Sequence, residues 1–335
     1  MEQEQEQARE EKQESVYEQI EQEIAPKAPI TRISIRTVAL LLLVTLVFGL
    51  VSGYLLGSRS TASSAANNPT AVPSKQANLI DQINPPNGHT VPAVFGDLGP
   101  SLLAAGAIDY DHFVQLYQQI GRPLTEEQIA LLTKGSAAPV VINRDSAHFM
   151  LNFFWAVGLA NKNRVLEEGP MKTYSQGQIG GFASTGGWTL GAKPPEALYA
   201  SALMIALTPE QQARLEEVTA SVYRPCCDNP THFPDCNHGM AMLGLLELMA
   251  SQNASVDQMF TAAKYVNAFW FPQQTLELAK FFQARQGVDF AQADARQVVG
   301  KSFSSGSGFQ TAHKWLADNG LLEQSPSAGG SCGVG

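Results

Sequence analysis

The pattern of apolar and polar positions divides the chain into one long apolar run and a series of shorter, mostly helical segments. Residues 37–57, TVALLLLVTLVFGLVSGYLLG, carry no charge over 21 positions, a length that crosses the hydrocarbon layer of a bilayer at helical rise. A cleaved signal peptide would start nearer the terminus and carry a shorter apolar core. The pattern therefore predicts an uncleaved transmembrane helix.

Basic residues lie mainly before this run, and the positive-inside rule then places the N-terminus in the cytoplasm. We expect a single-pass protein of the cell membrane whose C-terminal domain is extracytoplasmic. Its contact with the lipid bilayer would be made by residues 37–57. The composition predicts a cytoplasmic polar tail at 1–36, a flexible linker at 58–78, an external helical domain at 79–325 and a Gly/Ser-rich tail at 326–335.

Helix start and stop signals recur between the two polar ends of the chain. Thr125 is an expected N-cap with Gln128 at the capping-box position, and Thr208 is an expected N-cap followed by a proline. Ser255 with Gln258 predicts a third such helix start. These signals favour a mostly α fold.

Two of these segments are similar enough to indicate an internal repeat. Residues 124–132 (LTEEQIALL) and 207–215 (LTPEQQARL) agree at six of nine positions, and each precedes the frame Asp-x-x-His-x-Met and an apolar segment. We predict two diverged helical hairpins, at about 124–160 and 207–251. The alternative is a common helix opening, with the aspartate of each frame acting as a helix cap.

Charge excludes one class of partner and missing motifs argue against two enzyme classes. The net charge is −9, and residues 1–36, with nine acidic and five basic side chains, account for −4 of it. The rest carries no Lys/Arg run, so no nucleic-acid partner is expected. Gly-x-Ser-x-Gly and His-Glu-x-x-His are both absent from the sequence. We expect binding, not catalysis.

The chemistry of the chain is concentrated in residues 224–240, RPCCDNPTHFPDCNHGM, which hold three of the four cysteines and two of the six histidines. Thiolate and imidazole are the ligands of zinc and copper. The cluster predicts a transition-metal site, for Cu or Zn, serving storage, delivery or detoxification. Its expected partner is a metal-donor or thiol protein. The predicted ligands are Cys226, Cys227, Cys236 and His238, with His232 as a spare ligand or a group behind the ligands.

Two other uses of these cysteines stay open at this point. A bridge from Cys226 or Cys227 to Cys236 would close a loop of about ten residues and contribute about 2–3 kcal/mol to stability. Cys236 at the start of a helix could instead be a thiolate that exchanges with a partner's disulfide. The spacing matches no common zinc pattern, because Cys-x-x-Cys is absent.

Residues 223–259, from Tyr-Arg-Pro-Cys-Cys to Ser-Val-Asp-Gln-Met, resemble known protein groups. The Pro-Cys loop before a helix, and a second helix opening with Ser-x-Asp-Gln, are similar to small extracytoplasmic cysteine-motif proteins that handle metals. The segment also resembles uncharacterised single-pass bacterial membrane proteins and, in layout, the thiol reductants of cytochrome c maturation. The resemblance implies metal or thiol chemistry. This chain lacks the denser cysteine spacing of the first group and the Cys-x-x-Cys of the last.

Overall fold

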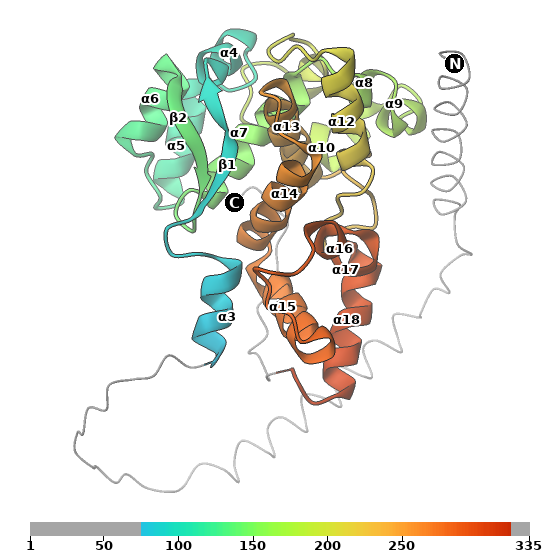
Figure 1. Ribbon diagram of the computed structural model, residues 1–335. Helices are drawn as coiled ribbons and strands as arrows, with labels where there is room; N and C mark the ends of the chain where they lie inside the picture. The colour runs from blue at the N-terminus through green and yellow to red at the C-terminus, as the bar shows by residue number, and fades with distance from the viewer. Residues whose placement is uncertain (1–74, 323–335) are drawn as a thin grey trace, which may run out of the picture. The chain divides into compact units, whose positions relative to one another are not determined.

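A computed structural model describes residues 75–322 of the chain (Figure 1). As predicted, this part is mostly helical. Its first half consists of α3 (Lys75–Ile83), β1 (His89–Gly96), α4 (Leu98–Ala105), α5 (Tyr110–Gln119), α6 (Glu126–Lys134), β2 (Ser136–Ile142) and α7 (Ala147–Ala160).

Short helices connect this half to the long helices of the second. They are α8 (Arg164–Glu167), α9 (Pro170–Tyr174), the 3-10 helix η1 (Ile179–Gly181), α10 (Ala183–Gly186) and α11 (Pro195–Leu198). The remaining helices are α12 (Pro209–Thr219), α13 (Asn237–Ser251), α14 (Val256–Trp270), α15 (Pro272–Gln286), α16 (Ala295–Val299), α17 (Lys301–Ser304) and α18 (Gly306–Asp318).

The three predicted helix starts are confirmed. Thr125, Thr208 and Ser255 are N-caps, and each forms a complete capping box with the glutamine three residues later. In each box the cap side chain accepts from the backbone of N3, and the N3 side chain accepts from the backbone of the cap.

Strands β1 and β2 form an antiparallel pair that the sequence analysis did not predict. Each strand contains a proline, Pro92 or Pro139, which cannot donate to a ladder and is therefore unfavourable within a strand. The register shifts between Val91 and Val94 and again between Val94 and Gly96. Such irregularities accommodate proline in a sheet of only two strands.

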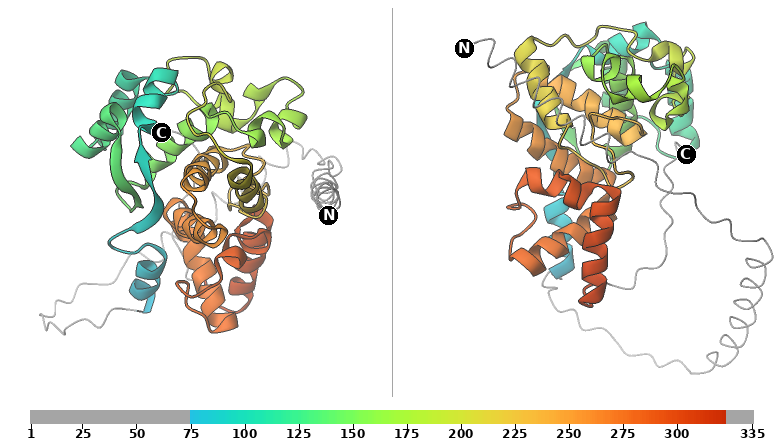
Figure 2. Two further views of the ribbon diagram at one scale, coloured as in Figure 1. Left: turned by 45° about the horizontal axis from the view of Figure 1, so that its top comes forward. Right: turned by 90° about the vertical axis from the view of Figure 1, so that its right-hand side faces the viewer.

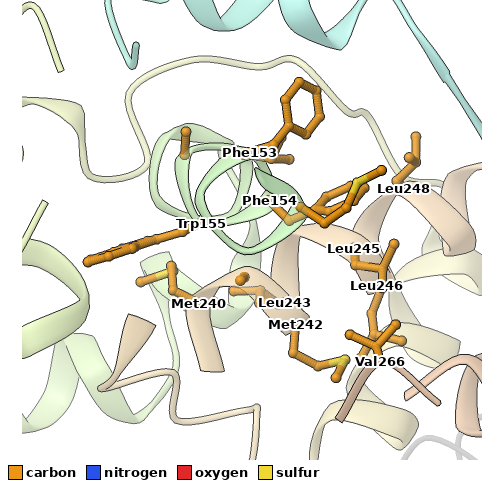
Figure 3. Packing of buried hydrophobic residues seen from close by; sticks show 14 of the residues in the cluster. Phe153, Phe154, Trp155, Met240, Met242, Leu243, Leu245, Leu246, Leu248 and Val266 are labelled. Carbon is orange, nitrogen blue, oxygen red and sulfur yellow. The ribbon is translucent and has the colours of Figure 1, made fainter. Parts of the chain in front are cut away.

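The main core is built around the crossing of α7 and α13. A methyl group at Gly158 would lie 2.1 Å from the Met240 carbonyl oxygen, and one at Gly244 would lie 2.5 Å from that of Phe154. Glycine therefore lets the two backbones touch. Most side chains of both helices are apolar and buried, as Figure 3 shows for the part near Trp155, and Asn152 and Glu247 are buried polar exceptions.

A second, smaller hydrophobic cluster joins α3, α15 and α18. These helices lie together beside the C-terminal end of α14 in all three views (Figures 1 and 2). Phe282 of α15, Leu316 of α18 and Phe290 are fully buried there. The cluster carries no cysteine among its buried residues.

The prediction of a membrane-spanning fold is wrong for the part of the chain that the structure describes. Between residues 75 and 322, no helix combines the length and the apolar character needed to cross a bilayer. The predicted location, a single-pass cell-membrane protein with an extracytoplasmic domain, falls with it. Four of the predicted segments lie wholly or mostly outside the described residues: the tail at 1–36, the apolar run at 37–57, the linker at 58–78 and the tail at 326–335.

The internal repeat stays a prediction. The aligned helices α6 and α12 have the same cap, but α6 lies against α4 whereas α12 lies against α13 and α14. The second helix of each proposed copy, α7 or α13, takes part in the central crossing.

Candidate metal centre

The cysteines lie in the irregular connection between α12 and α13, and the last of them begins a helix. Cys236 is the N-cap of α13: its backbone is extended, and its Sγ accepts a hydrogen bond from the backbone N of Gly239 at 3.4 Å. A cap position points the side chain back over the unpaired N–H groups of the first turn. The helix therefore fixes where this sulfur lies.

Arg224 holds the rest of the connection around that sulfur. Its side chain is only 1% exposed, and its Nε donates to Cys236 Sγ at 3.1 Å. Nη1 donates to the Asn229 carbonyl at 2.8 Å, and Nη2 donates to the Phe233 carbonyl at 3.2 Å and to Asp235 Oδ1 at 2.7 Å. One buried guanidinium thus ties four points of the loop together.

The ligating atoms form two overlapping groups that share Cys236. In the first, those of Cys226, Cys236 and His238 all lie within 4.8 Å of one another, and the Cys226 and Cys236 sulfurs are 3.5 Å apart. In the second, those of Cys227, Asp235 and Cys236 meet the same limit. The structure therefore brings together four of the five predicted ligands in a cluster that can hold a metal ion.

His238 supplies an imidazole in the form that metals bind. Burial lowers its pKa to about 4 against the opposing charge of Cys236, and the charge of Arg224 adds a smaller lowering, so the ring is neutral at pH 7. Its Nδ1 is buried and has no hydrogen-bond partner within the described chain. The ring packs against Phe271 and Trp270, with centroids 4.4 and 5.8 Å away.

The thiols differ in the ease with which they lose a proton. Hydrogen bonds from Cys226 and Cys227, together with the positive charge of Arg224, lower the pKa of Cys236 well below its usual value despite burial. The hydrogen bonds that Cys226 makes with the other two thiols, together with burial, raise its own pKa. Cys236 is therefore the thiol of the cluster that loses its proton first as the pH rises.

The arginine stays charged next to that thiolate. Burial alone lowers the pKa of Arg224, but the charges of Cys236, Cys227 and Asp235 outweigh burial and raise it. Burial raises the pKa of Asp235 by more than Arg224 lowers it. A buried cation with good hydrogen-bond partners compensates thiolate charge in the absence of a metal ion.

His232, the fifth predicted ligand, lies outside both groups. Its ring is buried, with Nδ1 3.5 Å from Thr219 Oγ1, and its backbone N donates to the Thr219 carbonyl. The histidine thus fastens the loop to the end of α12. Met240 and Met242, which follow His238 on α13, are buried in the core (Figure 3).

The predicted helix cap was placed one residue too early. Asp235 was expected to cap α13, but Cys236 does so, and the Asp235 carboxylate accepts from Arg224 and from Asn229 Nδ2 instead. His148, the counterpart of His238 in the proposed repeat, belongs to neither ligating group.

Arg224 is the functional residue that sequence reasoning missed. An arginine next to a proline in a loop is usually solvated, so its burial was not expected. The signal that could have indicated its role is its place at the start of a segment with three cysteines, where a fixed cation stabilises thiolates.

The C-terminal helices hold the same loop from outside. The Gly306 backbone N donates to the Cys227 carbonyl at 2.8 Å, and the Ser307 backbone N donates to Asp228 Oδ1 at 2.7 Å. The N-cap of α18 is Ser305, and Asp228 accepts a further hydrogen bond from the first turn of that helix. The loop with the cysteines is therefore also held from the side of α18.

Comparisons with protein-family models, with curated proteins and with solved structures found no match to this chain.

Proposed function

We propose that the protein binds a transition metal ion of the Cu or Zn class at the cluster, with Cys226, Cys236 and His238 as ligands. The observation that carries the proposal is the convergence of their three ligating atoms within 4.8 Å of one another. His238 also has a buried Nδ1 without a hydrogen-bond partner in the described chain. An orphaned buried nitrogen is costly, and coordination would satisfy it.

Cys227 is the fourth ligand in this proposal. It belongs to the second group through Cys236, and a thiolate there would complete the four-ligand set that zinc prefers. Three ligands without Cys227 would suit Cu(I), which accepts soft donors. The role that fits a binding site of this kind is storage, delivery or detoxification of the ion, with a metal-donor or thiol protein as partner.

The test is titration of the reduced full chain with Zn²⁺ and, separately, with Cu⁺ under anaerobic conditions, against a competing chromophoric chelator. We expect one ion per chain and loss of free-thiol reactivity on binding. Cys236→Ser retains an N-cap oxygen but removes the shared ligand, so we expect at least a hundredfold weaker binding. His238→Phe keeps the aromatic packing and removes the imidazole.

His232→Gln is the matched control, because it changes a buried histidine of the same loop that lies outside both ligating groups. It should bind the ion as the natural chain does. Failure of the reduced chain to bind either ion would overturn the proposal, as would equal weakening by His232→Gln and His238→Phe. Cys227→Ser distinguishes the two metals, because it should weaken the binding of Zn²⁺ far more than that of Cu⁺.

The separation of the Cys226 and Cys236 sulfurs, 3.5 Å, favours one second candidate, thiol–disulfide exchange. The Cys236 thiolate would attack a partner's disulfide and expel one partner thiolate. The Cys226 thiol would then lose its proton, attack Cys236 Sγ in the mixed disulfide, form the Cys226–Cys236 bond and release the second partner thiolate. Free-thiol counts distinguish the two, since a chelator exposes metal-bound thiols and only a reductant exposes bridged ones.

A further inference from the structure

A cavity of about 560 Å³ lies where the α5–α6 connection, β2 and the first turn of α7 meet. Its volume is in the range of about 300–1,000 Å³ that small-molecule sites occupy. None of the residues of the cysteine cluster lines it. The cavity is therefore a separate feature of the fold, and the metal centre gives it no role.

One wall of the cavity is apolar and fixed. Phe95, Leu131, Phe149 and Met150 line it, and all four are buried in the main core. Phe149 packs against Tyr117, with ring centroids 6.2 Å apart. Because these side chains are held by the core, the wall offers a preformed surface to an apolar body.

Arg122 also lines the cavity as an exposed residue, and its backbone position is set by the end of α5. Gly121 has a left-handed φ of +69°, its N donates to the Gln118 carbonyl at 3.1 Å, and the Arg122 N donates to the Tyr117 carbonyl at 2.9 Å. This pair of bonds is the glycine-dependent closure that ends many helices. Arg122 therefore starts from a fixed point at the cavity edge.

The Arg122 guanidinium has no ion pair among the residues that the structure describes, although it lines the cavity. The other arginine there, Arg144, is engaged: it donates to the Asn84 carbonyl at 3.3 Å and lies 3.7 Å from Asp81. An unpaired guanidinium beside an apolar wall is the arrangement that recognises a carboxylate through two parallel hydrogen bonds.

Other lining groups restrict the charge of the ligand. Burial and the nearby charge of Arg122 lower the pKa of His148, so its ring is neutral at pH 7. A hydrogen bond from its own backbone lowers the pKa of Glu127, which stays ionised. Glu127 and Asp145 both line the cavity and oppose phosphate esters and other multiply charged anions.

We propose that this cavity binds a small apolar monocarboxylate, with its hydrocarbon body against Phe149 and Met150 and its carboxylate on Arg122. The site is independent of the metal centre. Arg122 supplies the charge, the apolar wall supplies the affinity for the body, and the acidic side chains exclude polyanions.

The test is calorimetric titration of the full chain with octanoate and with 2-naphthoate, using 1-octanol, 2-naphthalenemethanol and inorganic phosphate as comparisons. We expect saturable 1:1 binding of at least one acid and at least tenfold weaker binding of the matching alcohol and of phosphate. Arg122→Gln should weaken the binding of the acid at least tenfold. Ala138→Leu, at an exposed lining position on β2, should weaken acid and alcohol together by filling the cavity.

Arg164→Gln is the matched control, because it removes an exposed arginine charge outside the cavity and should leave binding unchanged. Cys236→Ser should also bind the acid normally, which separates this proposal from the metal proposal. Absence of saturable binding of both acids below about 1 mM would overturn it. Equal affinity of acid and alcohol, or an Arg122→Gln chain that binds as the natural one does, would overturn it too.

Discussion

The buried guanidinium of Arg224 makes four hydrogen bonds to atoms spread over residues 229–236, one of them buried and three partly buried. Removing the guanidinium leaves several of these acceptors unsatisfied, which costs more than the net value of the bonds. The Arg224 side chain therefore holds the loop in the conformation that brings the thiols together.

Arg224→Met should therefore lower the free energy of unfolding by about 3–5 kcal/mol and raise the pKa of the Cys236 thiol. Urea unfolding and thiolate absorbance against pH measure the two effects. Arg164→Met, at an exposed pair with Glu168, is the control and should change stability by less than about 0.5 kcal/mol. An equally small effect at Arg224 would contradict the network.

His89 gives the protein a pH dependence away from the metal centre. Its ring stacks on Tyr265 with centroids 4.2 Å apart, and burial, then the charge of Lys264, lower its pKa to about 4 from the ordinary 6.5. The unfolded chain therefore binds a proton between pH 6.5 and 4 that the folded chain does not. The contribution of His89 to the free energy of unfolding is therefore fully present above pH 6.5 and is lost as the pH falls from 6.5 to 4.

His89→Phe keeps the stacked ring and removes the titration. Chemical unfolding between pH 7 and 4 should show a shallower loss of stability for the variant, by at most about 1.4 kcal/mol per pH unit. His112→Phe, at an exposed position on α5, is the control. Identical slopes for His89→Phe and the natural chain would contradict the assignment.

Sequence alone indicated residues that the structure brings together in the cluster, but not the group that arranges them. The density of cysteine and histidine in residues 224–240 indicated Cys226, Cys236 and His238, because these residue types have few other uses at such density. The direction of the His232 ring and the burial of Arg224 depend on packing against α12 and α13, and no local pattern encodes either of these.

Helix starts were predictable because their chemistry is local. The three capping boxes need only a hydroxyl and a glutamine three residues apart, so Thr125, Thr208 and Ser255 were correctly placed. The β1–β2 pair was missed because a strand is stabilised by a distant partner. Its alternation of buried Val91, Ala93 and Phe95 was present but was interrupted by proline.

The crossing of α7 and α13 is sensitive to a single methyl group. Gly244→Ala places a carbon 2.5 Å from the Phe154 carbonyl oxygen, so the helices must move apart, and stability should fall by about 1–3 kcal/mol or more. Gly181→Ala meets no atom within 4 Å and is the control. Thermal and urea unfolding of both variants test this, and equal stability would argue against the contact.

On the scale of the whole molecule, α14 connects the two hydrophobic clusters. Met259, Val266 and Phe269 of this helix lie in the main core, among others, and Ala268 lies in the smaller cluster, where its carbonyl accepts from Asn84. The cysteine loop is held by helices of both parts, through Thr219 on one side and Gly306 on the other. On the proposed function, metal binding would therefore be linked to the stability of the fold.

Metal binding should stabilise the entire described fold. An ion that binds only the folded chain adds about 2.7 kcal/mol at a free concentration one hundred times Kd. Thermal unfolding with and without buffered Zn²⁺ measures the gain, which Cys236→Ser should abolish. A stabilisation that persists in this variant would place the ion elsewhere.

The hydrogen bond from Gly306 to the Cys227 carbonyl makes the first turn of α18 a reporter of the loop. An ion that draws the Cys227 sulfur toward Cys236 must act on a backbone already clamped by that amide. We therefore expect the hydrogen-exchange rates of the Gly306 and Ser307 amides to slow on loading. Amides in the middle of α18 should slow less, and only through the overall gain in stability. The ligating atoms already lie within 4.8 Å of one another, so loading of the proposed site would require little refolding.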